Sequence, residues 1–384
     1  MEEKKNVCAA LKKCGGCQWL YKPYALQLKE KLQWTREQLK AYCKVDDIAG
    51  MEQPLHYRHK VHAVFAQDRK RYAVSGKYAA KSHEVVPVDT CYLEHRLADA
   101  IISSIRDLLA SFKIRPYDED REMGLLRHVL VRIGYETKEV MVVLVLSSPM
   151  LPGKKNFVKV LRAKHPEITT LVLNVNDKRT SMVLGAHEEV LFGKGYICDR
   201  LLGKVFRISP KSFYQVNPIQ AQVLYEKALD GAHIRKDDIV LDAYCGTGTI
   251  SILASDRCAH VIGVEKNPDA IRDAKVNARE NDAKNTHFYV KDAGDFCMEL
   301  AASKEKVDVV ILDPPRKGAG SVFIESLCRL KPRSIVYISC QPLSLAQDLK
   351  LLTQGGYRAR LGSAVDMFPY TKEVECVVWL ERKS

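Results

Sequence analysis

The 384-residue sequence lacks any long hydrophobic run, since its longest apolar stretch covers only residues 140–146. A membrane-spanning helix needs about 20 such residues. The charged start Met-Glu-Glu-Lys-Lys is not followed by the apolar core of a signal peptide. Internal repeats and low-complexity segments are also missing. With 46% apolar and 28% charged residues, the composition is that of a globular protein, which we expect in the reducing cytoplasm and not at a membrane.

Two common nucleotide-binding motifs are absent as well. No G-x-x-x-x-G-K-[ST] occurs, which argues against ATP chemistry. A Gly-Thr-Gly turn is present at 246–248, but position 251 is Ser where a dinucleotide-binding motif has Gly or Ala. The sequence therefore does not favour a nicotinamide-dependent dehydrogenase.

Positive charge is plentiful but unevenly distributed. Before Val205 there are 35 basic and 24 acidic residues, a net charge of +11; from Val205 onward there are 25 and 23, a net charge of +2. The segment 54–84 interleaves seven Lys and Arg with four aromatic residues, as in surfaces that neutralise phosphates and stack bases. We expect residues 1–205 to bind nucleic acid. The alternative for this segment is a solvated, lysine-rich strand surface.

The apolar periodicity changes near residue 206. Between about 55 and 200, short β-type runs predict an antiparallel or mixed sheet with a helix over 97–112. A further helix is predicted over 21–43 and is a candidate for packing on the C-terminal part. From 206 on, apolar strands alternate with helices such as 268–280, which predicts a mainly parallel sheet. The expected fold class is α/β, with a β-rich domain over 1–205 and a Rossmann-like domain over 206–384.

Polar residues follow the ends of the predicted parallel strands. The first strand leads into Asp242-Ala-Tyr-Cys-Gly-Thr-Gly-Thr249, whose glycines let a ligand approach the backbone. Glu265 ends the second strand, where a carboxylate can accept hydrogen bonds from both ribose hydroxyls. Asp292 follows the third strand, placed to accept from an adenine amino group, and Asp313-Pro-Pro-Arg follows the fourth. This arrangement resembles S-adenosylmethionine-dependent methyltransferases.

A cysteine follows the fifth strand. Cys340 would reach the same edge of the sheet, and Glu375 precedes the final apolar strand. Carbon 5 of a pyrimidine is a weak nucleophile until a thiolate adds to carbon 6, and a base must later remove the carbon-5 proton so that the thiol leaves. Cys340 and Glu375 suit these two tasks without a metal. For an isolated cysteine, burial as a small apolar residue is the simpler interpretation.

Four of the twelve cysteines are spaced like metal ligands. The chain begins with Cys8-x5-Cys14-Gly-Gly-Cys17, and Cys91 follows 74 residues after Cys17. Thiolates two to five residues apart can surround one metal centre, which a distant fourth thiolate closes. Spacing alone leaves zinc, an iron–sulfur cluster and coincidence open.

Five ordered motifs together resemble the RNA (uracil-5-)-methyltransferase family. They are Ser212-Phe-Tyr-Gln215-Val-Asn217, Asp242-x-Tyr244-Cys-Gly-x-Gly, Asp313-Pro-Pro-Arg, Ile338-Ser-Cys340-x-Pro and Asp366-Met-Phe-Pro…Val-Glu375. The resemblance implies that Cys340 is the nucleophile and Glu375 the proton acceptor. It also implies that S-adenosylmethionine is bound by Gln215, Tyr244, Thr249, Glu265, Asp292 and Asp313.

Three positions depart from the family pattern. Gln341 stands where Asn often follows the cysteine, and Tyr370 where His often follows the Asp-Met-Phe-Pro run. Glu373 replaces the usual His two residues before the glutamate. The first two changes alter uracil contacts without removing a catalytic group, whereas the third makes Glu373 the main rival of Glu375 for the role of base.

The resemblance also interprets the cysteine pattern. The ribosomal-RNA branch of the family has C-x5-C-G-G-C…C around a [4Fe–4S] cluster, which implies that Cys8, Cys14, Cys17 and Cys91 are its ligands. It favours 23S ribosomal RNA as the substrate. Only seven residues precede Cys8 in this sequence. The chain therefore resembles the short form of this branch, which has no N-terminal TRAM barrel.

The resemblance extends to RNA contacts, in Arg58-x-Lys60 and Leu126-Arg127-His128-x-x-x-Arg132. The target uridine would be read from an unpaired loop and flipped into the site. One alternative is 5-methyluridine formation in the T-loop of transfer RNA. Methylation of an amino group is disfavoured by Arg316 after Asp-Pro-Pro, and an inactive RNA-binding protein by the intact Cys340 and Glu375. Nothing in the sequence requires more than a monomer.

Overall fold

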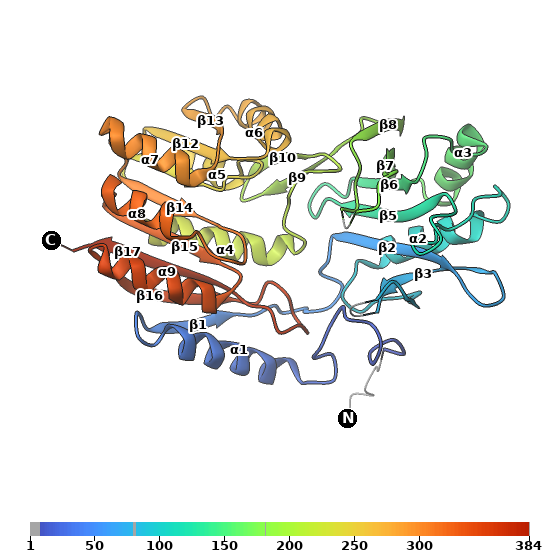
Figure 1. The fold of residues 1–384 in the computed structure, drawn as a ribbon, viewed down its shortest axis with the longest axis horizontal. Coiled ribbons are helices and arrows are strands. Elements are labelled where there is room, and N and C mark those ends of the chain that lie inside the picture. The colour runs from blue at the N-terminus through green and yellow to red at the C-terminus, as the bar shows by residue number, and fades with distance from the viewer. Residues whose placement is uncertain (1–7, 80–81, 181, 384) are drawn as a thin grey trace. The chain divides into compact units, whose positions relative to one another are not determined.

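A computed structural model of the chain describes residues 8–79, 82–180 and 182–383 (Figure 1). The chain divides into two compact units. Unit 1 consists of Met1–Lys22, Gln53–Arg200 and Arg207–Lys211, and unit 2 of Pro23–Glu52, Leu201–Phe206 and Ser212–Ser384. The helix predicted over 21–43 therefore belongs, together with the strand after it, to the unit that contains the C-terminal sheet.

Unit 2 is built on an eight-stranded sheet in the order β1-β16-β17-β15-β14-β11-β12-β13. Its central strands are parallel, and β17 runs antiparallel to both of its neighbours. The strands are β1 (Val45–Ala49), β11 (Ile239–Ala243), β12 (His260–Glu265), β13 (Thr286–Val290), β14 (Val309–Leu312), β15 (Ser334–Ser339), β16 (Tyr357–Val365) and β17 (Glu375–Arg382).

Helices cover both faces of this sheet. One apolar core joins it to α4 (Pro218–Gly231), α5 (Thr249–Ser255) and α6 (Pro268–Glu280). The other joins it to α1 (Tyr24–Leu39), α7 (Ala293–Ser303), α8 (Ser321–Leu330) and α9 (Pro342–Gln354), which lie together on the near side in Figure 1. Strands covered on both faces are almost continuously apolar, as 309–312 and 334–339 are.

Unit 1 contains a seven-stranded mixed sheet in the order β4-β3-β2-β5-β6-β7-β8. Helices α2 (Arg96–Leu108) and α3 (Lys154–Lys164) share an apolar core with one of its faces. The strands are β2 (Lys60–Gln67), β3 (Ala73–Tyr78), β4 (Val85–Pro87), β5 (Leu126–Ile133), β6 (Val140–Leu146), β7 (Ile168–Val175) and β8 (His187–Phe192). The short strands β9 (Ile197–Leu201) and β10 (Lys204–Ile208) pair where the chain passes between the units.

The predicted α/β class is confirmed, with two refinements. The sheet of unit 1 is mixed because β6 and β7 are joined through α3, and a crossover helix makes consecutive strands parallel. The sheet of unit 2 gains β1, β16 and an antiparallel β17, which a reading of alternating strands and helices does not predict. Within the described residues no helix is long and apolar enough to cross a membrane.

Candidate functional site

The carboxyl ends of the parallel strands of unit 2 meet at one edge of its sheet. The order of strands reverses there, because β12 lies on one side of β11 and β14 on the other. Such a switch point is where open α/β sheets bind ligands. The register pairs Ala243 with both Val264 and Leu312. Tyr244, Glu265 and Asp313, one residue further along each strand, therefore lie side by side.

The glycine turn after β11 leaves space at this edge. Tyr244 has φ +66° and Gly246 has φ +54°, so the backbone turns sharply through the left-handed region. A Cβ atom at Gly246 would meet nothing within 4 Å, whereas one at Gly248 would lie 3.0 Å from the Phe288 ring. Gly248 is therefore needed for packing, and Gly246 faces open space that a ligand can fill.

Carboxylates gather beside this turn. Asp242 is buried and accepts a 2.5 Å hydrogen bond from Ser251 through Oδ2, while its Oδ1 has no partner in the part of the chain that the structure describes. Burial, with the charges of Asp313 and Glu265 adding to it, raises the pKa of Asp242 to about 7. Burial likewise raises the pKa of Asp313 to about 7. The edge is rich in acceptors and short of donors, which suits a ligand with hydroxyl and ammonium groups.

The other residues predicted to bind the cofactor surround the same edge. The 212–217 loop that carries Gln215 is tied to the glycine turn, because Thr247 donates through Oγ1 to the carbonyl oxygen of Phe213 at 3.3 Å. Thr249 begins α5 directly after the turn. Asp292 is exposed and caps α7, since its Oδ1 accepts from the Gly294 N–H at 2.8 Å.

Cys340 and Glu375 lie close to each other. The antiparallel ladder of β15 and β17 pairs Ser334 with Glu381 and ends by pairing Ser339 with Cys376. Cys340 and Glu375 each lie one residue beyond this last pair, and the charge of Glu375 acts on the Cys340 thiol, so the two side chains are close. Because β17 is antiparallel, its first residue reaches the edge where the parallel strands end. The thiol and the carboxyl group are thus brought together from 35 residues apart in the sequence.

The electrostatics of the pair are dominated by burial. Burial raises the pKa of the Cys340 thiol to about 11; the charges of Glu375 and Asp313 add to the shift, and that of Arg316 opposes it. Glu375 is 5% exposed, and its pKa lies well above the usual value, because of burial first and the charge of Asp313 second. Burial disfavours the charged form of both groups, and the charge of the Arg316 guanidinium lowers the pKa of each.

Glu373 differs from Glu375 in its surroundings. Its side chain is 36% exposed, and its Oε2 lies 2.9 Å from Nη2 of Arg316. Its carboxylate is thus already engaged by a guanidinium, whereas Glu375 is buried. Sequence reasoning named Arg316 only as part of a motif. In the structure it pairs with Glu373, and its charge acts on Glu375 and Cys340, a proximity that the sequence does not show.

The residues predicted to contact RNA lie in unit 1, on β2, on β5 and just before β2. Lys60 pairs with Arg132 across the two strands, and burial, with the Arg132 charge adding to it, lowers the pKa of Lys60 to about 8. Arg127 is buried and donates to Glu119 and to the carbonyl oxygens of Asn176 and Lys178. His128 is also buried, and burial lowers its pKa to about 4. Contact of Arg58, Lys60, Arg127, His128 and Arg132 with RNA stays a prediction.

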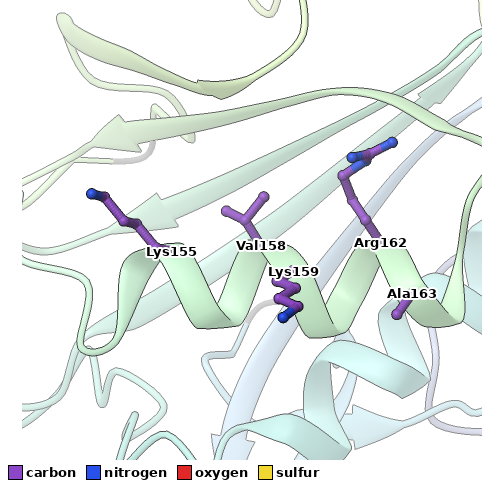
Figure 2. A pocket seen from close by; sticks show the side chains of 5 residues that line it. All are labelled: Lys155, Val158, Lys159, Arg162 and Ala163. Carbon is purple, nitrogen blue, oxygen red and sulfur yellow. The ribbon is translucent and has the colours of Figure 1, made fainter.

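A basic hollow lies on α3. This helix has five basic residues and no acidic one. Lys155, Val158, Lys159, Arg162 and Ala163 line a hollow of about 420 Å³, and Figure 2 shows Lys155 and Arg162 extending from the same side of the helix. The Arg162 guanidinium lies 3.5 Å from the centre of the Phe192 ring, which orders it. Sequence analysis did not single out this helix, although its composition was visible.

The four cysteines predicted as cluster ligands lie in unit 1. Burial raises the pKa of Cys17 to about 11, and the charges of Cys14 and Cys8 add to the shift, so these three thiols are neighbours. Among residues 8–79, 82–180 and 182–383, however, no three His, Cys, Asp or Glu side chains are grouped closely enough to hold a metal ion. The structure therefore does not establish a metal site.

Comparisons with known proteins agree with the geometry of unit 2. The chain matches the family described as tRNA (uracil-5-)-methyltransferase over residues 23–383. It is 41% identical over 376 residues to an uncharacterised RNA methyltransferase of Oceanobacillus iheyensis, covering 96% of this chain and 82% of the relative. An uncharacterised RNA methyltransferase of Halalkalibacterium halodurans is 39% identical, with 98% and 83% covered.

A solved structure is similar over almost the whole chain. It is the tRNA (uracil-54, C5)-methyltransferase of Pyrococcus abyssi in complex with S-adenosyl-L-homocysteine, with a TM-score of 0.80 and 28% identity, covering 96% of this chain and 86% of that one. Together with the family match, this shows that the chain is an enzyme and belongs to the tRNA (uracil-5-)-methyltransferase family.

Proposed function

We propose that the protein methylates carbon 5 of a uridine in RNA with S-adenosylmethionine as methyl donor. The observation that carries this proposal is the proximity of Cys340 and Glu375 at the sheet edge where the predicted cofactor-binding residues converge, since their strands pair as far as Ser339 and Cys376 and the charge of Glu375 acts on the Cys340 thiol. A thiol and a carboxyl group close together are what covalent activation of uracil requires.

The reaction follows from these two groups. The ionised Cys340 sulfur adds to carbon 6 of uracil, and the electron pair of the C5–C6 bond moves toward carbon 5. S-adenosylmethionine would supply the electrophilic methyl group that carbon 5 takes up; the bond from this methyl group to the sulfonium sulfur breaks, and S-adenosylhomocysteine is the leaving group. Glu375 then accepts the carbon-5 proton; the electrons of the C–H bond restore the C5–C6 double bond, and the sulfur leaves carbon 6 as thiolate. No metal takes part in these steps.

Glu375 is favoured over Glu373 as the base. Glu375 is buried close to Cys340, and its raised pKa makes it an avid proton acceptor once ionised. Glu373 is paired with Arg316. We assign Glu373 the role of holding Arg316 beside the thiol, where the guanidinium stabilises negative charge on sulfur.

The residues of the edge fit S-adenosylmethionine. Glu265 would accept from the ribose hydroxyls and Asp292 from the adenine amino group, as their places after β12 and β13 suggest. The unpartnered Oδ1 of Asp242 and the raised pKa of Asp313 show that this edge needs positive or donor groups. Gln215, Tyr244 and Thr249 complete the proposed set, around the open space over Gly246.

We propose 23S ribosomal RNA as the substrate, with the T-loop of transfer RNA as the second candidate. The cysteine pattern favours the first. The similarity to a transfer-RNA enzyme over 96% of the chain favours the second. In either case unit 1 would hold the RNA, with α3 contacting its phosphates. The charged residues of this helix are all basic and one arginine is ordered, which is typical of a surface that binds a polyanion.

We also propose that Cys8, Cys14, Cys17 and Cys91 bind a [4Fe–4S] cluster. The spacing Cys8-x5-Cys14-Gly-Gly-Cys17, with Cys91 as a distant fourth thiol, supports this proposal.

Arg58 supports the cluster proposal. Its Nη2 donates to Gly16 in the Cys14–Cys17 turn, and its backbone pairs with Leu93 and His95, just after Cys91. Its Nε–H is buried without a partner among the described residues. A positively charged hydrogen-bond donor between the two cysteine segments fits an anionic cluster.

The proposed function is tested by mapping 5-methyluridine in 23S ribosomal RNA and transfer RNA by mass spectrometry, in cells with and without the gene. We expect one or more 5-methyluridines in 23S ribosomal RNA to disappear with the gene and to return in vitro with purified protein and S-adenosylmethionine. Loss in transfer RNA alone would select the second substrate. An unchanged 5-methyluridine map, with no activity in vitro, would overturn the proposal.

A further inference from the structure

Helix α1 buries its polar side. Gln27, Lys31, Thr35 and Leu39 form a stripe with a spacing of four residues and are at most 1% exposed, whereas Leu26 and Trp34 are 44% and 37% exposed. A helix that packed only for apolar burial would show the opposite pattern. The buried amide and ammonium groups therefore have specific partners, and these identify what the helix does.

Those partners lie in the 366–374 segment, which leads directly to Glu375. Nζ of Lys31 lies 2.6 Å from Oδ1 of Asp366 and donates to the carbonyl oxygen of Phe368 at 3.0 Å. Asp366 is fully buried, so the ion pair is shielded from water. One turn earlier in α1, Oε1 of Gln27 accepts from the N–H of Tyr370 at 2.9 Å. Two side chains of α1 thus hold every second residue of the segment from 366 to 370.

Tyr370 is the strained point of this segment. Its φ is +64°, in the left-handed region that a tyrosine rarely adopts, and such a conformation persists only where surrounding contacts enforce it. The bond from its N–H to Gln27 is one such contact, and the Tyr24 ring, 5.9 Å away, is another. The strain redirects the chain five residues before Glu375.

We propose that Gln27 and Lys31 are positioning residues that hold the 366–374 segment so that Glu375 meets the carbon-5 proton of the methylated intermediate. This inference rests on the proposed function, since it concerns its last step. If the segment loosens, thiolate addition and methyl uptake still proceed at Cys340, but proton removal slows. The methylated covalent adduct then accumulates, because the C6–S bond breaks only when the proton has left.

The test is a single-turnover reaction of the full chain with substrate RNA and radiolabelled S-adenosylmethionine, analysed on a denaturing gel that separates adduct from released RNA. Gln27→Leu removes the acceptor for the Tyr370 N–H without leaving a buried charge. We expect it to increase the ratio of labelled adduct to labelled free RNA about tenfold, with total methyl transfer within threefold of the unmodified protein. Gln33→Leu is the matched control, because Gln33 lies on the exposed side of α1 and donates to the Glu37 carboxylate of the same helix.

A second variant guards against a simple loss of stability. Lys31→Met with Asp366→Leu replaces the buried ion pair by apolar groups, which is often tolerated where removal of one partner is not. We expect the same increase in adduct, larger than for Lys31→Arg. Adduct and total methyl transfer falling together in both variants would overturn the inference and leave α1 a structural helix.

The two proposals fail in distinguishable ways. Glu375→Gln, run alongside, accumulates adduct if the proposed reaction is right. If it does so while Gln27→Leu and the double variant partition like the unmodified protein, only the positioning role is wrong. If Glu375→Gln forms no adduct, the proposed reaction itself is wrong, and the positioning role with it.

Discussion

The two units of the molecule differ most in charge. Unit 1 has 31 basic and 19 acidic residues, a net charge of +12, whereas unit 2 has 29 and 28, a net charge of +1. Unit 2 places its carboxylates at the ends of strands, where burial raises the pKa of Asp242 and Asp313 to about 7. Unit 1 places cations on strand and helix faces. This difference supports the proposal that unit 1 binds RNA and unit 2 carries the chemistry, and we therefore expect each function to be removable without the other.

The largest effect should come from Cys340→Ala. Without the thiol nothing adds to carbon 6, so 5-methyluridine formation should fall at least about 10³-fold, while RNA affinity, which we assign to unit 1, should stay within twofold. Methyl-group incorporation and filter binding measure the two. Turnover that survives, or affinity that falls with it, would break the separation of the units.

Loss of the proposed cluster should affect unit 1 alone. Protein purified without oxygen should contain about four iron atoms per chain. Cys17→Ser should lose most of this iron and about tenfold in RNA affinity, since the segments that Arg58 joins come apart. Binding of S-adenosylmethionine to unit 2, followed by calorimetry, should change less than twofold. A preparation that contains zinc and no iron would contradict the cluster assignment.

The basic hollow on α3 should contribute a smaller, salt-dependent part of RNA affinity. Lys155→Gln, Lys159→Gln and Arg162→Gln together should weaken RNA binding about tenfold at low salt. The slope of log K against log salt should fall by roughly 2, at about 0.7–0.9 per phosphate contact. Single-turnover methylation at saturating RNA should be unchanged.

Three exposed lysines of unit 2, Lys275, Lys284 and Lys350, provide the control. Their triple replacement by Gln should leave the salt slope unaltered. If both triple variants lower it equally, the attraction follows net charge and not the α3 surface.

The smallest effect should be on the reactivity of the Cys340 thiol. With its pKa raised to about 11, alkylation by iodoacetamide should increase about tenfold per pH unit up to that value. Glu375→Gln removes a charge that raises this pKa, so the midpoint should move to lower pH, and Arg316→Gln should move it higher. Peptide mass spectrometry distinguishes Cys340 from the other cysteines. If the three proteins gave the same pH profile of alkylation, neither Glu375 nor Arg316 would influence the Cys340 thiol.

The sequence predicted the fold of unit 2 well, and its candidate site residues could be recognised because they follow the ends of apolar strands. Glu265 and Asp313 follow apolar strands, and the parallel register brings such ends together in any doubly wound sheet. To predict that Glu375 lies near Cys340, one must also know that β17 runs antiparallel to β15. The apolar composition of β17 does not reveal this direction. The polar stripe of Gln27 and Lys31 was unreadable for a related reason, since the leucines of α1 predicted the helix but not the face that it buries.

Unit 1 was less predictable. Its basic character was evident, but Arg127, taken as an RNA contact, is buried and bonded within the protein. Charge counts do not distinguish a cation that holds the fold from one that meets a ligand; only its partners do. Arg58 illustrates the same point. Its place in a basic run suggested contact with RNA, whereas its hydrogen bond to Gly16 suggests a role beside the cysteines.

The account depends most on Cys340 and Glu375 acting on one uridine. Its direct test is Glu375→Gln incubated with substrate RNA and S-adenosylmethionine, digested with protease and nuclease, and analysed by mass spectrometry. We predict a Cys340 peptide joined to a 5-methylated uridine, because the proton that must leave has no acceptor. Undiminished turnover with no adduct, or an adduct on another cysteine, would contradict the account.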